Sequence, residues 1–238
     1  MSVDIMIDLE TMGNSADAAI LSIGACAMSA ELGIGSAIYR PVSLASSIAA
    51  GGVVDASTVL WWAGQGDKAR ATLGQCDDTG MEITTALAEL MLWMDQLGPK
   101  KERRVWGNGA DFDLPILASA IRRSGFDVPW HHWNSRCYRT LKSLHRQIPQ
   151  PEREGIHHHA MDDAMHQARH WVEIMRGTSV VVVTPASNPP RECPFCNFEG
   201  TVHCGDVKDD ILARGGTLGN CSNAMFYGRK ATGAEGGA

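Results

Sequence analysis

Three groups of acidic and histidine side chains in this sequence could together hold divalent metal ions. The first is Asp8 and Glu10, which are separated by one residue; the second is Asp113, with Asp111 as a competing carboxylate; the third lies within residues 157–163. Each group lies at the expected end of a helix or strand. Carboxylate oxygens in this arrangement suit Mg²⁺ or Mn²⁺ better than Zn²⁺. Four carboxylates can hold two ions about 4 Å apart, a geometry suited to phosphodiester hydrolysis.

The pair Asp8 and Glu10 ends a short apolar stretch, residues 3–7, that predicts a buried strand. Because strand side chains alternate between faces, the two carboxylates share one face of the sheet. A carboxylate beside an apolar core must be hydrogen-bonded, paired or bound to metal. The pair is therefore a candidate metal site, although a strand that ends in a polar turn is the simpler interpretation of an isolated Asp-x-Glu.

Three adjacent histidines, His157, His158 and His159, precede a predicted helix that Asp162 and Asp163 open. An imidazole with a pKa near 6.5 can take the proton from an attacking water. The run also suggests a zinc hydrolase, but adjacent side chains point in different directions and make poor joint ligands. The simpler alternative is a capped helix with a polar lead-in.

In their order along the chain, these groups resemble the motifs of the DEDDh 3′→5′ exonucleases. Asp8-Leu9-Glu10-Thr11 matches the first motif, Asn108 with Phe112-Asp113 the second, and His158 followed by Asp163 the third. The resemblance covers roughly residues 1–176. The segments that narrow it to the subgroup of exonuclease VIII-like proteins and the mycobacterial exoribonuclease are residues 5–11, 59–62, 106–113 and 136–142.

The resemblance implies a ribonuclease H-like α/β fold, a mixed five-stranded sheet flanked by helices, and two Mg²⁺ or Mn²⁺ ions. By the same resemblance, Asp8, Glu10 and Asp163 hold the ion that activates water. Asp8 also reaches a second ion, to which Asp113 is linked through water, and His158 is the general base. The products would be nucleoside 5′-monophosphates.

Spacing alone leaves the register of the third motif open, because His157 and Asp162 stand as far apart as His158 and Asp163. The family phrase His-x-Ala-x-x-Asp-Ala favours His158 and Asp163. The Phe-Asp pair likewise favours Asp113 over Asp111. Asp111 and Asp162 would then cap helices or lie on solvated faces.

The resemblance implies a nucleic-acid substrate, single-stranded or with a 3′ overhang, for which the charge distribution could supply a local basic face. The chain has a net charge of −6, yet residues 100–153 carry 11 Lys or Arg and only 5 Asp or Glu. Within them, Arg136, Arg139, Lys142 and Arg146 would share one face of a helix. Such a face could follow a phosphate backbone, or it could be an ordinary solvated surface. The candidate substrate contacts are Asn108, Arg136, Arg139 and, from the resemblance, the backbone around Thr11 and Met12.

Several tryptophans could stack on bases, but aromatic residues near apolar runs are more often core residues, so none is assigned to substrate. They are Trp61, Trp62, Trp130 and Trp133.

The elements that must position these residues alternate in the manner of a layered α/β domain. Apolar runs predict strands, and apolar residues at helical spacing predict helices. The expected strands are residues 3–7, 19–28, 35–42 and 103–106, and the expected helices are residues 56–71, 82–97, 113–123 and 163–176.

The seven cysteines fall into two groups. Cys26, Cys76 and Cys137 are isolated in periodic sequence and are expected to be small buried apolar residues. The others suggest a structural Zn²⁺, because Cys-Pro-Phe-Cys resembles the opening of small zinc ribbons, including the Lar-like restriction-alleviation proteins. The second half lacks another Cys-x-x-Cys, so either His203 or Cys204 completes the site or the segment is a decayed tail. The candidate zinc ligands are Cys193, Cys196, Cys204 and Cys221.

The 238 residues allow one to two domains. We expect an exonuclease domain at residues 1–178, a linker at 179–192, a zinc-binding segment at 193–230 and a disordered tail at 231–238. The longest apolar stretch falls short of the ~18 residues of a membrane span, and the first basic residue is Arg40, so no secretory signal is expected and the protein is predicted to be cytoplasmic. A homodimer is an option. The alternative function is an inactive nucleic-acid binding module, against which the complete set of acidic residues argues.

Overall fold

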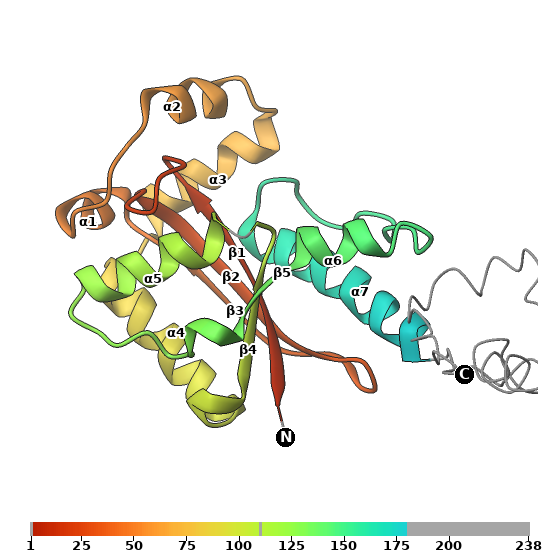
Figure 1. Cartoon of the computed structure of the whole chain (residues 1–238). Helices are drawn as coiled ribbons and strands as arrows, with labels where there is room; N and C mark the ends of the chain where they lie inside the picture. The colour runs from red at the N-terminus through yellow and green to blue at the C-terminus, as the bar shows by residue number, and fades with distance from the viewer. Residues whose placement is uncertain (1, 110, 180–238) are drawn as a thin grey trace, which may run out of the picture. The chain divides into compact units, whose positions relative to one another are not determined.

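The computed structural model describes residues 2–109 and 111–179 (Figure 1). The predicted linker from residue 180 onward, the four candidate zinc cysteines and the predicted tail lie outside the described residues, while Ser179 is the last residue of the final described helix. Within the described part, none of the helices combines the length and the apolar composition that a membrane crossing needs.

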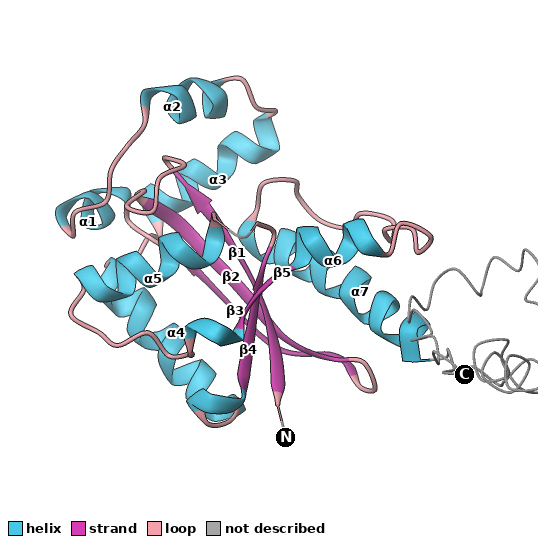
Figure 2. Ribbon diagram, viewed as in Figure 1, coloured by secondary structure: helices cyan, strands magenta, loops and turns pink. Residues whose placement is uncertain are grey.

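A mixed five-stranded sheet forms the centre of the domain, which confirms the predicted fold class (Figure 2). The strand order is β3-β2-β1-β4-β5. β1 pairs antiparallel with β2 and parallel with β4; β2 pairs antiparallel with β3, and β4 parallel with β5. The strands are β1 (Val3–Thr11), β2 (Ile20–Ser29), β3 (Gly33–Pro41), β4 (Arg103–Gly107) and β5 (Ser135–Cys137).

Helices cover both faces of the sheet. Helices α4 and α5 pack on one face, and α7 packs across β1, β2 and β3 on the other. The helices are α1 (Leu44–Ala49), α2 (Ala56–Ala63), α3 (Asp67–Asp78), α4 (Ile83–Leu97), α5 (Asp113–Arg123), α6 (Tyr138–Leu144) and α7 (Ala160–Ser179), with 3₁₀ turns η1 (Lys100–Glu102) and η2 (His132–Asn134).

The central strand β1 is buried on both faces, and its alternation sorts side chains between two cores. Ile5 and Ile7 face α4 and α5, where they join the larger apolar cluster, while Met6 lies on the opposite face against Trp171 of α7. Complete burial of a side chain such as Ile5 stabilises the fold by about 1.5–3 kcal/mol. The strand that carries the first acidic motif is therefore held between two packed layers.

Several sequence predictions need correction. The predicted helix at residues 56–71 is two helices, α2 and α3, because the chain turns at Gly64 and Gly66. Helix α1 and strand β5 were not predicted, since each is too short to show a periodic pattern. Helix α7 begins at Ala160 and continues past Gly177.

The basic residues at 136–146 do not share one helix. Arg136 lies in β5, Arg139 and Lys142 lie in α6, and Arg146 lies beyond the end of α6. The even spacing of these residues predicts a single helical face, but the helix begins only at Tyr138, after the strand that carries Arg136.

The isolated cysteines and the tryptophans divide by burial. Cys26 and Cys76 are buried as predicted, whereas Cys137 is partly exposed and its Sγ accepts a hydrogen bond from the Thr140 backbone at the start of α6. Trp62 and Trp130 are core residues. Two tryptophans are not: Trp61 is 44% and Trp133 61% exposed.

Candidate active site

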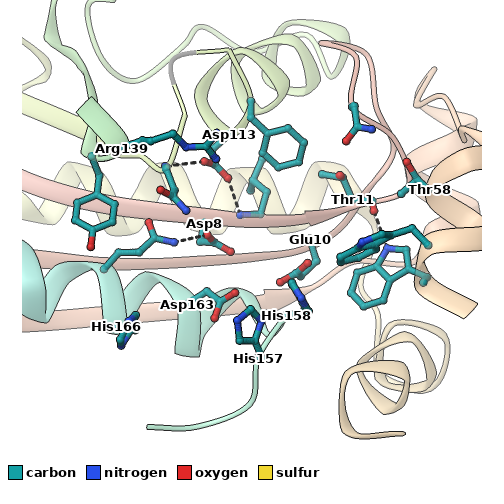
Figure 3. A pocket seen from close by; sticks show the side chains of 18 of the residues that line it. Asp8, Glu10, Thr11, Thr58, Asp113, Arg139, His157, His158, Asp163 and His166 are labelled. Carbon is teal, nitrogen blue, oxygen red and sulfur yellow. Dashed lines mark hydrogen bonds between the residues drawn. The ribbon is translucent and has the colours of Figure 1, made fainter. Parts of the chain in front are cut away.

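The end of β1 presents Asp8 and Glu10 on the face of the sheet that α7 covers (Figure 3). Leu9 lies between them and points into the opposite core, as strand alternation requires. Asp8 and Glu10 are only 8% and 7% exposed. The amide of Gln167 in α7 fixes Asp8, because its Nε2 donates a hydrogen bond of 2.6 Å to Asp8 Oδ1.

Gly24 allows α7 to begin directly over these carboxylates. On β2, Gly24 is the partner of Asp8 in the strand pairing. A Cβ at this position would lie 2.3 Å from the carbonyl carbon of Ala160, the first residue of α7. No side chain fits in that space. The missing side chain therefore brings the first turn of α7, with Asp163, next to β1.

Asp113 reaches the same place from the first turn of α5. Its Oδ1 accepts a hydrogen bond of 3.2 Å from the backbone N–H of Leu9, and its Oδ2 accepts one of 2.9 Å from Asn108. Gly107 lies against it, since a Cβ on Gly107 would stand 3.0 Å from Asp113 Oδ2. Asp113 is buried beside the end of β1, whereas Asp111 is an exposed residue of the preceding loop.

The two aspartates of the third motif point to different places. Asp162 turns back to the loop before α7, where its Oδ2 accepts a hydrogen bond of 2.7 Å from the Ile156 N–H. Asp163 points toward Asp8 and Glu10, and one oxygen from each of these three residues lies within 4.8 Å of the others. Three carboxylate oxygens at such spacing fit one divalent cation.

His157 and His158 both face this acidic cluster, while the ring of His159 packs on Tyr39 with ring centroids 4.5 Å apart. His158 has a positive φ of 61°, and its ring meets that of Trp61 edge-on with centroids 4.8 Å apart. A nitrogen of each facing histidine lies within 4.8 Å of a ligand oxygen of Asp163. The structure therefore brings both candidate histidines to the site, contrary to the expectation that adjacent histidines diverge.

These side chains line one cavity of about 670 Å³. Thr11, Asn108 and Arg139 also line it, as predicted substrate contacts would. Met12 is buried in the cluster under α2 and α3 instead, and Arg136 lies outside the cavity. Lys142, another member of the predicted basic group, lines the cavity too. Polar residues of the cavity that were not predicted include Gln150, Arg153, His166 and Gln167.

A protein-family model described as the 3'-5' exoribonuclease Rv2179c-like domain matches residues 3–175. This match covers well over half of the chain. The chain belongs to this family. It is a 3′–5′ exonuclease of the DEDDh type, and the resemblance drawn from the sequence motifs is confirmed.

Solved structures of other nucleases share the fold of this exonuclease. The nuclease domain of 3'hExo, a DEDDh family member bound to rAMP, is 16% identical with a TM-score of 0.53, over 74% of this chain and 92% of that one. Cell-death related nuclease 4 (CRN-4) is 12% identical with a TM-score of 0.52, over 74% of this chain and 64% of that one. E. coli exonuclease I, in complex with a dA16 oligonucleotide, is 16% identical with a TM-score of 0.51, over 74% of this chain and 41% of that one.

This chain thus spans less than two thirds of the lengths of CRN-4 and exonuclease I. Among curated proteins, no sequence is similar enough to the exonuclease to count as a match.

Burial and mutual repulsion disfavour the ionised form of the carboxyls in the acidic cluster of the exonuclease. Burial, with the nearby charge of Asp113, raises the pKa of Glu10 to about 8 and the pKa of Asp8 well above its usual range. Burial also raises the pKa of Asp113 to about 6, against the opposing effect of its backbone hydrogen bonds. Arg153 forms an ion pair with Asp163 and lowers the pKa of both Asp8 and Glu10. A cluster with these properties favours a bound cation.

Burial acts in the opposite direction on the histidines. It lowers the pKa of His158, and the neighbouring His157 and Arg153 lower it further. His158 is therefore neutral at pH 7 and can accept a proton.

Of two further polar residues of the site, Gln167 and Arg153, only the first could be predicted from the sequence. Gln167 lies four residues after Asp163 and so shares its face of α7, a spacing that a helix prediction makes visible. Arg153 lies in the irregular segment between α6 and α7, where no periodic pattern shows which side chains point inward.

Proposed function

We propose that this exonuclease hydrolyses phosphodiester bonds at the 3′ end of single-stranded nucleic acid, using two Mg²⁺ or Mn²⁺ ions and releasing nucleoside 5′-monophosphates. The observation that carries the proposal is the convergence of Asp8, Glu10 and Asp163 oxygens within 4.8 Å, beside Asp113, in one cavity. The buried carboxylates with raised pKa values fit divalent cations. When bound, two such ions supply an activated water and neutralise charge on the phosphate.

The residues divide the work of the reaction by position. Asp8, Glu10 and Asp163 would hold one ion, and Asp8 would reach the second on the side of Asp113. His158, neutral at pH 7, would take the proton of the attacking water on an imidazole nitrogen. Arg139 would bind phosphate groups on the α6 side of the cavity.

The sugar preference of this exonuclease is the finer part of the proposal. The description of the family names an exoribonuclease, which favours RNA. Exonuclease I, which shares the fold, holds a DNA oligonucleotide. Phosphate contacts through Arg139 would serve both, so a direct comparison of the two substrates is needed.

The test is a gel assay with 5′-labelled single-stranded DNA and RNA in Mg²⁺, Mn²⁺, Zn²⁺ or EDTA. We expect a ladder that shortens from the 3′ end with Mg²⁺ or Mn²⁺ and disappears with EDTA and in Asp8→Ala. Cleavage with Zn²⁺ alone would instead support a zinc hydrolase built on His157 and His158. Binding without cleavage under every condition would contradict the proposed function.

Metal binding to this exonuclease is expected to release protons near pH 7. Because the pKa of Glu10 is raised to about 8 and that of Asp8 is also raised, the metal-free cluster holds protons at pH 7 that a metal must displace. Affinity for Mn²⁺ should therefore rise with pH until about pH 8. Calorimetry in buffers of different ionisation enthalpy measures the proton release directly.

Glu10→Gln is the matched control for this measurement. It removes one of the carboxyls whose raised pKa keeps a proton on the cluster at pH 7, so the variant should release fewer protons and bind metal more weakly. Wild-type binding with no proton release at pH 7 would show that the cluster is already ionised.

A further inference from the structure

We propose that the surface beside β5 is a second binding site of this exonuclease, for the single strand upstream of its 3′ end. Bases would stack on Trp133, and phosphates would contact Lys100 and Arg122. The inference rests on the proposed function and extends it from the reacting nucleotide to the strand that follows. Its evidence is the charge of the cavity walls, a second cavity and a rigid exposed aromatic pair.

The first observation concerns the direction in which the strand leaves the active site. The wall formed by α2 and the end of β1 contributes Asn14, Ser57, Thr58 and two tryptophans to the cavity, and no positive charge. The opposite wall, at α6, contributes Arg139 and Lys142. Phosphates beyond the reacting one would therefore pass the first turn of α6, and β5, which carries Arg136, directly precedes that turn in the chain.

The second observation is a separate cavity of about 530 Å³. Residues of α5 and of the segment that leads into β5 line it. Lys100, Arg122, His131 and His132 line it, with one acidic residue, Asp127. This composition favours an anionic ligand such as a phosphate backbone.

The third observation is that Trp133 stands exposed next to this cavity on a fixed support. Its ring is 61% exposed and stacks on His131 with centroids 4.3 Å apart and an interplanar angle of 7°. Arg136 is held beside it, since Arg136 Nη1 donates a hydrogen bond of 2.6 Å to the Trp133 carbonyl. A flat aromatic pair flanked by a guanidinium is the type of platform on which nucleic-acid bases stack.

The loop under this platform is held by hydrogen bonds from neighbouring elements. Arg103 of β4 donates a bond of 2.9 Å to the Pro129 carbonyl, and the Asn134 side chain donates one of 3.0 Å to the Lys101 carbonyl. Binding would therefore cost little loop ordering, which favours a ligand site over an accidental exposure.

Single-stranded nucleic acid is a better occupant than a second copy of the chain. Two cations, Lys100 and Arg122, outnumber the one carboxylate of the cavity, Asp127. Arg136 adds a third positive charge in β5, the strand that joins this segment to α6. A self-complementary interface of like charges would be repulsive.

The test compares short and long substrates in Trp133→Ala and Arg122→Ala of the full chain. An oligonucleotide of about 3 nucleotides would occupy the active site alone, whereas one of about 20 would also reach the second surface. For the long substrate we expect KM to rise roughly tenfold with kcat unchanged. The short substrate should be cleaved as by wild type.

Two exposed residues on other elements serve as controls. Leu92→Ala on α4 removes an exposed apolar side chain, and Lys68→Ala on α3 removes an exposed positive charge. Neither should change KM for either substrate. Equal effects of the test variants on both lengths, or no effect on the long one, would overturn the proposal, as would a changed oligomeric state in Trp133→Ala.

A binding measurement keeps this inference separate from the proposed activity. Fluorescence anisotropy with a labelled oligonucleotide of about 20 nucleotides in EDTA should show that Arg122→Ala lowers the salt dependence of binding by about one phosphate contact. If wild type binds the strand in this way but cleaves nothing, the proposed function fails and the second site stands. If wild type cleaves and the salt dependence is unchanged, the second site fails.

Discussion

Replacing Asp8 by asparagine is expected to abolish exonuclease activity and, at the same time, to stabilise the metal-free fold. Activity should fall at least about 10³-fold, because the variant loses the charge that would hold both ions. Stability should rise because burial raises the pKa of the Asp8 carboxyl well above its usual range, so folding opposes its ionisation. Thermal unfolding in EDTA, with a gain of roughly 2–4 °C for each kcal/mol, measures the second effect.

The pH dependence of this gain has a definite sign. A carboxyl whose pKa is raised on folding weakens the fold progressively as pH rises from about 4, its unfolded value, to its folded value. Asparagine does not titrate, so the advantage of Asp8→Asn should be small at pH 5 and larger at pH 8. An advantage that shrinks with rising pH would contradict the electrostatic explanation.

Asp4→Asn is the matched control, on the same face of the same strand. Asp4 is also buried, at 4% exposure, but it forms an ion pair with Arg104 and accepts a hydrogen bond of 2.8 Å from Trp106. The Arg104 side chain is 39% exposed, so the expected loss of stability comes mainly from weakening the charge-assisted hydrogen bonds that the buried Asp4 carboxylate accepts. Asp4→Asn should therefore lower the unfolding temperature and leave the cleavage rate per folded molecule close to wild type.

Gly24→Ala is expected to cause the second large effect, through the position of α7. The new Cβ would lie 2.3 Å from the Ala160 carbonyl carbon, which is backbone and cannot turn away. The first turn of α7 would have to move, and Asp163 with it. We expect an unfolding temperature lower by roughly 2–12 °C, since overpacking costs about 1–3 kcal/mol. Activity measured on the folded fraction should fall more than about tenfold, and Mn²⁺ affinity should fall too.

Gly35→Ala tests whether this effect is specific. Gly35 lies on the neighbouring strand β3, and a Cβ there would be 3.6 Å from the Ala27 carbonyl oxygen, an ordinary contact. The variant should keep wild-type stability and activity. If Gly24→Ala behaved in the same way, the close approach of α7 would not be what positions Asp163.

The sequence was most informative where chemistry and periodicity coincided. Asp8 and Glu10 follow a strongly apolar strand, so alternation alone placed them on one face. Asp113 and Asp163 each lie in the first turn of a helix, where a carboxylate also favours the helix dipole. Motifs at the ends of long, periodic elements therefore predicted both the fold and the acidic cluster.

The features of the site that the sequence did not predict depend on contacts between distant segments of the chain. The close approach of the first turn of α7 to the sheet depends on Gly24, a residue with no chemistry of its own. Arg153 enters the site from an irregular loop, and the exposed Trp133 differs from the buried Trp130 only through the path of the loop between them. Neither the spacing of residues nor the composition of the chain predicts such tertiary contacts.

The backbone of His158 bears on how this position can change in evolution. Among the described residues it is the one non-glycine residue with a positive φ, a conformation that costs of order 1 kcal/mol for an ordinary side chain. Glycine would remove that cost, and asparagine would reduce it. Mutational drift under selection for folding alone would therefore lead away from histidine. Under the proposed role of His158 as general base, only selection for the reaction would keep histidine here, so this position would distinguish active from inactive descendants.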